Sequence, residues 1–386
     1  MTLSFQRNIT LRHPGAITFG VGCAMDAVEW LLQHQPRSVL IVHARSVTNL
    51  ASSLADRLRQ RDVATVAIAG VPAEPDVANF ERLRAEIHAA QISAVIAVGG
   101  GSVLDVAKLL AALHHSSASV REFFGSGLLK SRPLPLVCLP TTAGTGSEVS
   151  PNAILYDDVD HLKKAVISPC LVPDAVFVDP QLTVSVPPAL TAATGIDALS
   201  HCLEAYANRA AHPLVDLYAL QGIRLIAAHL QRAVDRPDDL EARSAVALGS
   251  LYGGLCLGPV NTAAVHALAY PLGSEFRLAH GLSIALLLPH VVRFNLTAAP
   301  ERYADIARAL GVSDGPDALA TATRGLDRLA ELCAECGIPR GLAACGVPPE
   351  AIPRMAVDAM KVTRLLKNNP RDVTLADAEQ IYRSAL

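Results

Sequence analysis

The stretch AVIAVGGGSVLDVAK, residues 94–108, joins an apolar run to three glycines and then to a helical pattern. This order is typical of a strand–turn–helix unit in a parallel α/β sheet. Glycines let the backbone approach phosphate oxygens, and the N-terminus of the following helix offers free N–H groups. The candidates for cofactor binding here are Gly99, Gly100, Gly101, Ser102 and Asp105. The alternative is a tight strand–helix turn, because the spacing is not the GxGxxG fingerprint.

A second glycine-containing loop, LPTTAGTGSE at residues 139–148, also follows an apolar run. Its hydroxyl groups can hydrogen-bond a pyrophosphate or a nicotinamide ribose. The candidate contacts are Thr141, Thr142, Thr145 and Ser147. One such stretch could be a polar surface loop, but two of them after successive strands favour a shared nucleotide ligand.

The order of strand and helix patterns predicts two domains. Strands are expected at 38–43, 63–69, 94–98 and 136–139, and a helix at 76–90. Beyond Pro187 and Pro188 the pattern becomes helical. The expected helical segments are 190–207, 213–233, 240–257, 262–270 and 377–382. We therefore predict an α/β dinucleotide-binding domain over 1–187 and an all-helical metal- and substrate-binding domain over 188–386.

Composition limits the class of protein. Of the 386 residues, 51% are hydrophobic and 18% charged, which favours compact folding over disorder. A net charge of −3 without a basic tract argues against nucleic-acid binding. No uninterrupted apolar stretch approaches the ~18 residues of a membrane span, and the N-terminus lacks a signal-peptide pattern. We expect a soluble cytoplasmic protein with no membrane partner.

Four side chains in the second half have the chemistry of a metal site. Asp197 and His201 lie four residues apart on one face of an expected helix, and His266 and His280 follow among glycines and prolines. Three imidazoles and one carboxylate suit divalent iron or zinc. A lone histidine is usually a core or surface residue, but ligand type and spacing agree for all four. A metal and a nucleotide in one chain indicate redox chemistry.

Taken together, these motifs resemble the iron-containing (group III) alcohol dehydrogenase family. The resemblance rests on GGGSVLDVAK, PTTAGTGSEVSPNAI, LTAATGIDALSHCLEAY, NTAAVHALAYPLG, AHGLSIALLLPHV and KNNPRDVTLADAEQIY, in the expected order. It implies a doubly wound N-terminal domain, a helical second domain with the four metal ligands, and an active site in the cleft between them. It also implies that Asn152 and Lys164 are further cofactor-side residues, and that the protein is a homodimer.

The implied reaction is hydride transfer between NAD(P) and a small alcohol/aldehyde or hydroxy-acid/oxo-acid pair, with Fe²⁺ as the metal and Zn²⁺ as the alternative. Other enzyme classes remain open: a glycerol dehydrogenase-like polyol oxidoreductase, and a dehydroquinate synthase-like lyase. A non-catalytic nucleotide- or metal-binding regulator is a third reading. The intact ligand set and both loops favour an active enzyme.

Three positions depart from the family pattern. Ala44 stands where an aspartate often contacts the adenosine ribose, and Arg45 beside it could pair with a 2′-phosphate, so use of NADP is plausible. Tyr270 replaces a frequent histidine near the nicotinamide. Arg277 is either a surface residue or an anion-binding group, and the second option would favour a hydroxy acid.

Overall fold

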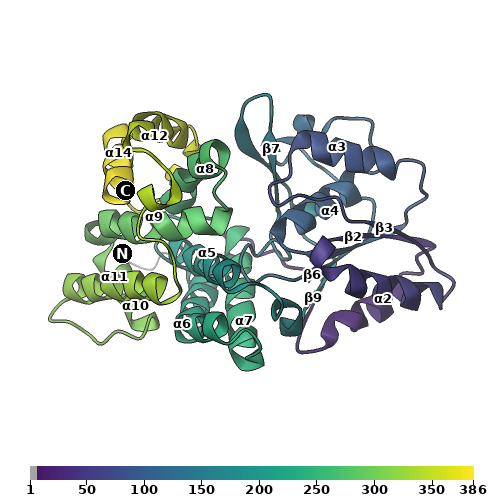
Figure 1. The fold of residues 1–386 in the computed structure, drawn as a ribbon, viewed down its shortest axis with the longest axis horizontal. Helices are drawn as coiled ribbons and strands as arrows, with labels where there is room; N and C mark the ends of the chain where they lie inside the picture. The colour runs from purple at the N-terminus through teal and green to yellow at the C-terminus, as the bar shows by residue number, and fades with distance from the viewer. Residues whose placement is uncertain (1–6) are drawn as a thin grey trace. The chain divides into compact units, whose positions relative to one another are not determined.

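The computed structural model describes residues 7–386, which divide into two compact units (Figure 1). The sheet unit comprises Arg12–Thr142 and Ser147–Thr183. The helical unit comprises Ala143–Gly146 and Val184–Leu386, together with residues 7–11. The chain therefore enters the helical unit briefly in the middle of the second glycine-containing loop and leaves it again at Ser147.

The sheet unit is built on a six-stranded parallel sheet, as the sequence predicts for an α/β fold. In spatial order the strands are β1 (Ala16–Phe19), β9 (Ala175–Val178), β6 (Leu136–Pro140), β4 (Ala94–Gly99), β2 (Ser38–His43) and β3 (Ala64–Ile68). Its helices are α1 (Asp26–Leu32), α2 (Thr48–Arg59), α3 (Val77–Glu86) and α4 (Gly101–Leu113). Figure 1 shows α2 on one side of the sheet and α3 and α4 on the other. Every residue of β4 and β6 is buried, since helices cover both faces.

A small second sheet follows the second loop, and the sequence analysis did not anticipate it. Strands β7 (Asn152–Asp157) and β8 (Leu162–Ile167) form an antiparallel hairpin, and the short β5 (Gly125–Ser126) pairs with β8. β8 begins Leu-Lys-Lys, so its first, partly buried half does not carry the apolar run that marks a buried strand.

The helical unit contains ten α-helices within the described chain. They are α5 (Pro188–Tyr206), α6 (Pro213–Asp235), α7 (Leu240–Leu257), α8 (Ala264–Phe276), α9 (His280–Asn295), α10 (Pro300–Ala309), α11 (Ala318–Glu335), α12 (Ile352–Met360), α13 (Thr363–Leu366) and α14 (Leu375–Ser384). The break at Pro187 and Pro188 is the start of α5, where proline fits the first turn. Glycine permits close packing of α5 on α6, because a Cβ at Gly195 would lie 2.2 Å from Leu230 Cδ1.

The end of α5, the helix that carries two of the candidate metal ligands, is fixed by a buried arginine of α10. Arg302 donates to both carboxylate oxygens of Asp216 at 2.7 and 2.8 Å and to the backbone carbonyl of Tyr206. Its guanidinium also lies 3.6 Å from the centre of the Tyr206 ring. A bidentate, charge-assisted contact of this kind has a narrow geometry, so it holds α5 in one orientation.

Helix α9 and the turn after it, His280–Ala298, are long and apolar enough by composition to cross a membrane. Within the protein, 56% of this stretch is buried. Its side chains Ile284, Leu287 and Leu288 pack into the core of the helical unit. Core packing accounts for the apolar character, which is weak evidence for a membrane span.

Candidate functional site

Three helices of one unit bring the four candidate metal ligands together. Asp197 and His201 lie one turn apart on α5, His266 lies in the first turn of α8, and His280 is the first residue of α9. The side chains of Asp197, His201 and His266 are 2–5% exposed. The side chain of His280 is 28% exposed, so the group is open on the His280 side.

The three imidazoles converge on a single carboxylate oxygen. Asp197 Oδ1 lies 3.7 Å from His201 Nε2, 3.4 Å from His266 Nε2 and 3.7 Å from His280 Nε2. Two ligand atoms held about 2.1 Å from one ion at a tetrahedral angle are about 3.4 Å apart. The spacing is therefore that of ligands around a shared divalent ion, and it is longer than a normal hydrogen bond.

Three buried side-chain atoms of the candidate ligands lack hydrogen-bond partners among the described residues: His201 Nδ1, and two atoms that face each other at 3.4 Å. Asp197 Oδ1 and His266 Nε2 are both buried and unpaired. A buried polar atom left without a partner costs about 1–3 kcal/mol, so such atoms usually mark a missing ion or water. Both atoms lie within the group whose ligand atoms could hold one metal ion. The donor set and its geometry fit divalent iron or zinc.

The electrostatics of the group also favour a cation. Burial would raise the pKa of Asp197, but the neighbouring histidines hold it well below its usual range. Burial lowers the pKa of His201. Burial also opposes protonation of His266, yet the carboxylates of Glu204 and Asp197 raise its pKa to about 10. Two buried carboxylates thus require a positive charge between them, supplied by a protonated imidazole or by a metal ion.

Glu204 belongs to this site, and the sequence analysis missed it. It is 4% exposed; its Oε2 accepts a hydrogen bond from His266 Nδ1 at 2.6 Å, and its Oε1 accepts one from the Val265 N–H at 2.7 Å. With the proton on Nδ1, Nε2 of His266 carries the lone pair that faces Asp197. Glu204 lies seven residues after Asp197, two helical turns on the same face of α5, so helical spacing could have revealed it.

Tyr270 lies at the open side of the metal-ligand group. It follows His266 by four residues on α8, is 9% exposed, and its ring centre lies 6.4 Å from that of His280. Arg277 is exposed and ends α8 with a left-handed backbone, at φ 55°. Of these two departures from the family pattern, Tyr270 therefore lies beside the metal-ligand group. Arg277 has the exposure of a surface residue.

The first glycine-rich loop lies at the carboxyl end of β4. Gly99 ends the strand, and α4 begins at Gly101 without a side-chain cap from any described residue. A Cβ at Gly99 would lie 2.6 Å from Val103 Cβ, and one at Gly100 would lie 3.2 Å from Thr142 Oγ1. The glycines therefore serve the tight turn, and the uncapped helix N-terminus that they leave is suited to phosphate. The Ser102 hydroxyl donates to the Ala73 carbonyl.

The two loops meet at neighbouring strand ends. The Thr141 N–H donates to the Gly99 carbonyl at 3.0 Å. Asp105 accepts hydrogen bonds from Ser147 Oγ at 2.5 Å and from the Ile154 N–H at 2.9 Å. The fully buried Lys108 donates to the backbone carbonyls of Ser150 and Asn152. These contacts tie α4 to the start of β7, so one framework holds both candidate cofactor loops.

The middle of the second loop belongs to the helical unit. Gly146 has a positive φ of 62°, and a Cβ there would lie 2.2 Å from Gly254 Cα on α7. Thr145 lies in this segment, whereas Thr141, Thr142 and Ser147 belong to the sheet unit. Only glycine at position 146 is compatible with both the backbone conformation and the contact with α7.

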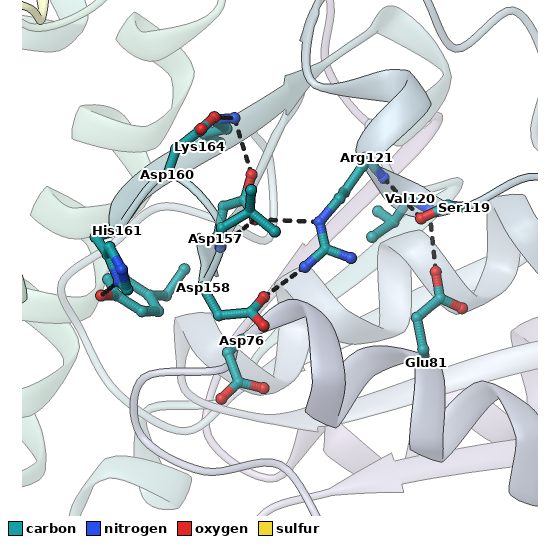
Figure 2. Close-up of polar contacts among 12 residues, drawn as sticks. Asp76, Glu81, Ser119, Val120, Arg121, Asp157, Asp158, Asp160, His161 and Lys164 are labelled. Carbon is teal, nitrogen blue, oxygen red and sulfur yellow. Dashed lines mark hydrogen bonds and ion pairs between the residues drawn. The ribbon is translucent and has the colours of Figure 1, made fainter.

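Of the two further cofactor-side candidates, Asn152 begins β7 and its Oδ1 is buried without a partner in the described chain. Lys164 on β8 instead donates to Asp157 at 2.8 Å and pairs with Asp160, as Figure 2 shows. Asp157 also accepts from Arg121. Burial would raise the pKa of Asp157, but these hydrogen bonds lower it. The Lys164 charge is thus neutralised within the β7–β8 hairpin.

Ala44 and Arg45 lie just after β2, the strand beside β4. The Ala44 N–H donates to the Val98 carbonyl at 2.9 Å. Arg45 is exposed, and its Nε donates to the Ala69 carbonyl at 3.2 Å. Position 44 carries no carboxylate, so at residues 44 and 45 the only charge that the end of β2 presents to a cofactor ribose is the positive charge of Arg45.

A parallel α/β unit with glycine-containing loops at its strand ends, joined to a helical unit with a His₃Asp centre, defines a metal- and nicotinamide-dependent oxidoreductase. Comparison with known proteins agrees. A family model for iron-containing alcohol dehydrogenase matches residues 14–180, and the model for the C-terminal part of that family matches residues 191–386.

Individual relatives match along most of the chain. It is 39% identical over 340 residues to long-chain-alcohol dehydrogenase 1 of Geobacillus thermodenitrificans, covering 87% of this chain and 86% of that one. It is 33% identical to the NAD-dependent methanol dehydrogenase of Bacillus methanolicus, covering 97% and 98%. The solved structure of an alcohol dehydrogenase from Oenococcus oeni superposes with a TM-score of 0.94 at 30% identity, covering 98% and 100%.

The chain therefore belongs to the iron-containing alcohol dehydrogenase family. It is an oxidoreductase that acts on small alcohols with a nicotinamide cofactor. The expectation drawn from the sequence motifs is confirmed at the level of family, fold and reaction class. The family assignment favours this reaction over the lyase alternative.

Proposed function

We propose that Asp197, His201, His266 and His280 hold one divalent iron or zinc ion at which an alcohol is oxidised, or an aldehyde reduced, by hydride transfer with NAD or NADP. The convergence of three Nε2 atoms on Asp197 Oδ1 carries this proposal. When bound, such an ion supplies a Lewis acid that polarises the substrate oxygen. In either direction the hydride would pass between the substrate carbon and the nicotinamide, so the protein side chains would hold and orient the reactants without taking up electrons.

The side chains around the site have separate tasks. Asp197 supplies the negative charge towards which all three imidazoles are oriented. Glu204 holds the proton of His266 on Nδ1, which keeps Nε2 available as a ligand. The partial exposure of His280 leaves an approach for substrate on the His280 side. Burial of the other three side chains excludes water from the rest of the centre.

Cofactor binding is proposed at the carboxyl ends of β4 and β6. The uncapped N-terminus of α4, at Gly101 and Ser102, would face phosphate oxygens. The hydroxyl groups of Thr141, Thr142, Thr145 and Ser147 would contact the pyrophosphate or the ribose next to the nicotinamide. Asp105 and Lys108 would act on this cofactor site indirectly, by fixing both loops to the start of β7.

We predict that Ala44→Asp shifts cofactor preference towards NAD by about tenfold. A carboxylate at the end of β2 can accept hydrogen bonds from the ribose hydroxyls and repels a 2′-phosphate. A tenfold change is about 1.4 kcal/mol, close to the lower end of the contribution of one hydrogen bond to a charged group. The measurement is the ratio of kcat/KM for NADH to that for NADPH, with Ser46→Asp as a control two residues away. An unchanged ratio in Ala44→Asp would show that position 44 does not contact the ribose.

Metal reloading tests the function itself. The metal-stripped protein, reloaded anaerobically with Fe²⁺ or Zn²⁺, is expected to oxidise NADH or NADPH in the presence of short aldehydes. Turnover that needs added metal supports the proposal. Equal turnover in the stripped protein, with its metal content verified as negligible, would contradict it.

We also propose that the enzyme is a cytoplasmic homodimer. All eight cysteines are free thiols, as expected in a reducing compartment. β1 lies at an edge of the parallel sheet, and the side chains of Ile17 and Phe19 on it are 38% and 37% exposed. An open apolar edge strand is a surface that a second copy can cover.

If β1 forms the dimer interface, Ile17→Lys combined with Phe19→Lys should yield a monomer. Two charges on the edge strand would oppose burial of this strand against a second copy. Light scattering coupled to gel filtration would measure the mass. Leu217→Lys on α6, where the leucine is 74% exposed, is a matched control that should remain dimeric. A dimeric double variant would exclude β1 as the interface.

A further inference from the structure

A guanidinium group lies beside the open side of the metal-ligand group. Arg364, on the short helix α13, donates from Nη2 to the hydroxyl oxygen of Tyr270 at 2.9 Å. Arg364 is partly buried, yet it forms no ion pair with any carboxylate of the described residues. Other arginines of the helical unit are neutralised, as Arg302 is by Asp216 and Arg354 by Glu275. Arg364 therefore keeps an unbalanced positive charge.

Tyr270 connects this charge to the metal-ligand group. Tyr270 follows His266 by one turn of α8, and its ring centre is 6.4 Å from that of His280. His280 is also the most exposed of the four candidate ligands. Through its contact with Tyr270, the guanidinium is therefore linked to the His280 side of the group, on which substrate would approach.

We propose that Arg364, positioned by Tyr270, binds the carboxylate of an anionic substrate. The enzyme would then favour hydroxy acids, and the corresponding aldehyde acids or oxo acids, over neutral alcohols and aldehydes of equal length. The inference rests on the function proposed above and adds the substrate class. A guanidinium has five N–H donors in a planar array that matches a carboxylate, and one contact to Tyr270 leaves the others available. The Tyr270 oxygen accepts from Arg364, so its own hydroxyl proton is free to donate to the same ligand.

This assignment replaces the sequence-based candidate Arg277. Arg277 is exposed at the left-handed turn after α8, where solvent screens its charge. Arg364 is distant from the ligands in sequence, being 84 residues after His280, and only the fold brings it to Tyr270. The two arginines therefore form a natural pair for comparison.

The test compares substrates that differ only in the terminal carboxylate. The iron-loaded enzyme would be assayed with succinic semialdehyde against butyraldehyde, and with glyoxylate against acetaldehyde. We expect the wild type to prefer the anion of each pair in kcat/KM. Arg364→Gln should reduce kcat/KM for the anions about tenfold or more, mainly through KM, and should change the neutral aldehydes by less than about twofold. Arg364→Lys should restore part of the preference.

Arg277→Gln is the matched control and should behave as wild type. Binding of succinate, measured by calorimetry on the metal-loaded protein, supplies a readout independent of turnover; it should weaken about tenfold in Arg364→Gln and stay unchanged in Arg277→Gln. A wild type that turns over neutral aldehydes without any preference for anions would overturn the inference while leaving the proposed function intact. Equal losses for both substrate classes in Arg364→Gln would overturn it too. Absence of turnover with every aldehyde would instead contradict the proposed function.

Discussion

His266→Ala is expected to lower kcat/KM by at least about 10³-fold while leaving the protein folded. The Lewis-acid contribution of a bound ion is several kcal/mol, and about 4 kcal/mol corresponds to a thousandfold in rate. His266 supplies the Nε2 atom nearest to Asp197 Oδ1, at 3.4 Å. Its removal would break the donor set and would leave Glu204, a buried carboxylate, without its imidazole partner.

The measurement combines metal analysis, steady-state kinetics and thermal unfolding. Bound iron should fall from about one ion per chain to a small fraction in His266→Ala, and the circular dichroism spectrum should be unchanged. His229→Ala is the control: His229 lies partly buried on α6, and its Nδ1 contacts the carbonyl of Leu225, away from the ligands. A fully active His266→Ala variant with normal metal content would remove His266 from the metal site.

Sequence patterns predicted the elements that carry strong, uniform signals. β2 and α7 begin and end at the predicted residues, because a continuous apolar run and a long helical period are each hard to mistake. The hairpin β7–β8 was missed. Lys163 and Lys164 break its apolar pattern. Lys164 is paired within the hairpin by Asp157 and Asp160, whereas Lys163 is paired by Glu74, which only the fold brings near.

The structure brings together the four residues that sequence reasoning chose as metal ligands, because ligand chemistry restricts the choice to a few residue types. Residues with other tasks are harder to assign. Asp105 and Lys164 were chosen as cofactor contacts, and the structure gives each of them protein partners: Ser147 for Asp105, and Asp157 for Lys164 (the latter in Figure 2). Whether a polar side chain faces a ligand or another side chain depends on tertiary contacts, and a linear motif does not contain them.

The same reason explains why Glu204 and Arg364 were overlooked. Neither belongs to the ligand set, so ligand chemistry does not select them. Each is recognised only by a side chain that it contacts: Glu204 by His266, and Arg364 by Tyr270. Such partners orient a site and adjust its charge. Predicting them from sequence requires knowing which helix faces meet, which becomes clear only when α5, α8 and α13 are placed.

Glu204→Gln is expected to weaken metal binding about 10- to 100-fold, the usual effect of removing a carboxylate that supports a metal-binding histidine. The glutamine keeps the volume of the buried side chain and can still accept one hydrogen bond, so the fold should persist. It no longer provides the negative charge beside His266 Nδ1, which lies 2.6 Å from Glu204 Oε2. His266 would then be less firmly oriented and a weaker ligand, and kcat should fall together with affinity.

Titration of the metal-free protein with Co²⁺, followed by the visible absorption of the bound ion, would give the dissociation constant and report a change in ligand geometry. Glu204→Leu should be worse than Glu204→Gln, because it leaves the His266 Nδ1–H and the Val265 N–H buried without an acceptor, at about 1–3 kcal/mol each. Asp305→Asn is the matched control; this carboxylate accepts from Tyr206 at the end of α5 but does not touch the ligands. A purely structural role for Glu204 would lower the melting temperature without altering the Co²⁺ affinity or the spectrum. Equal affinity and an identical spectrum in wild type and Glu204→Gln would therefore restrict Glu204 to a role in stability.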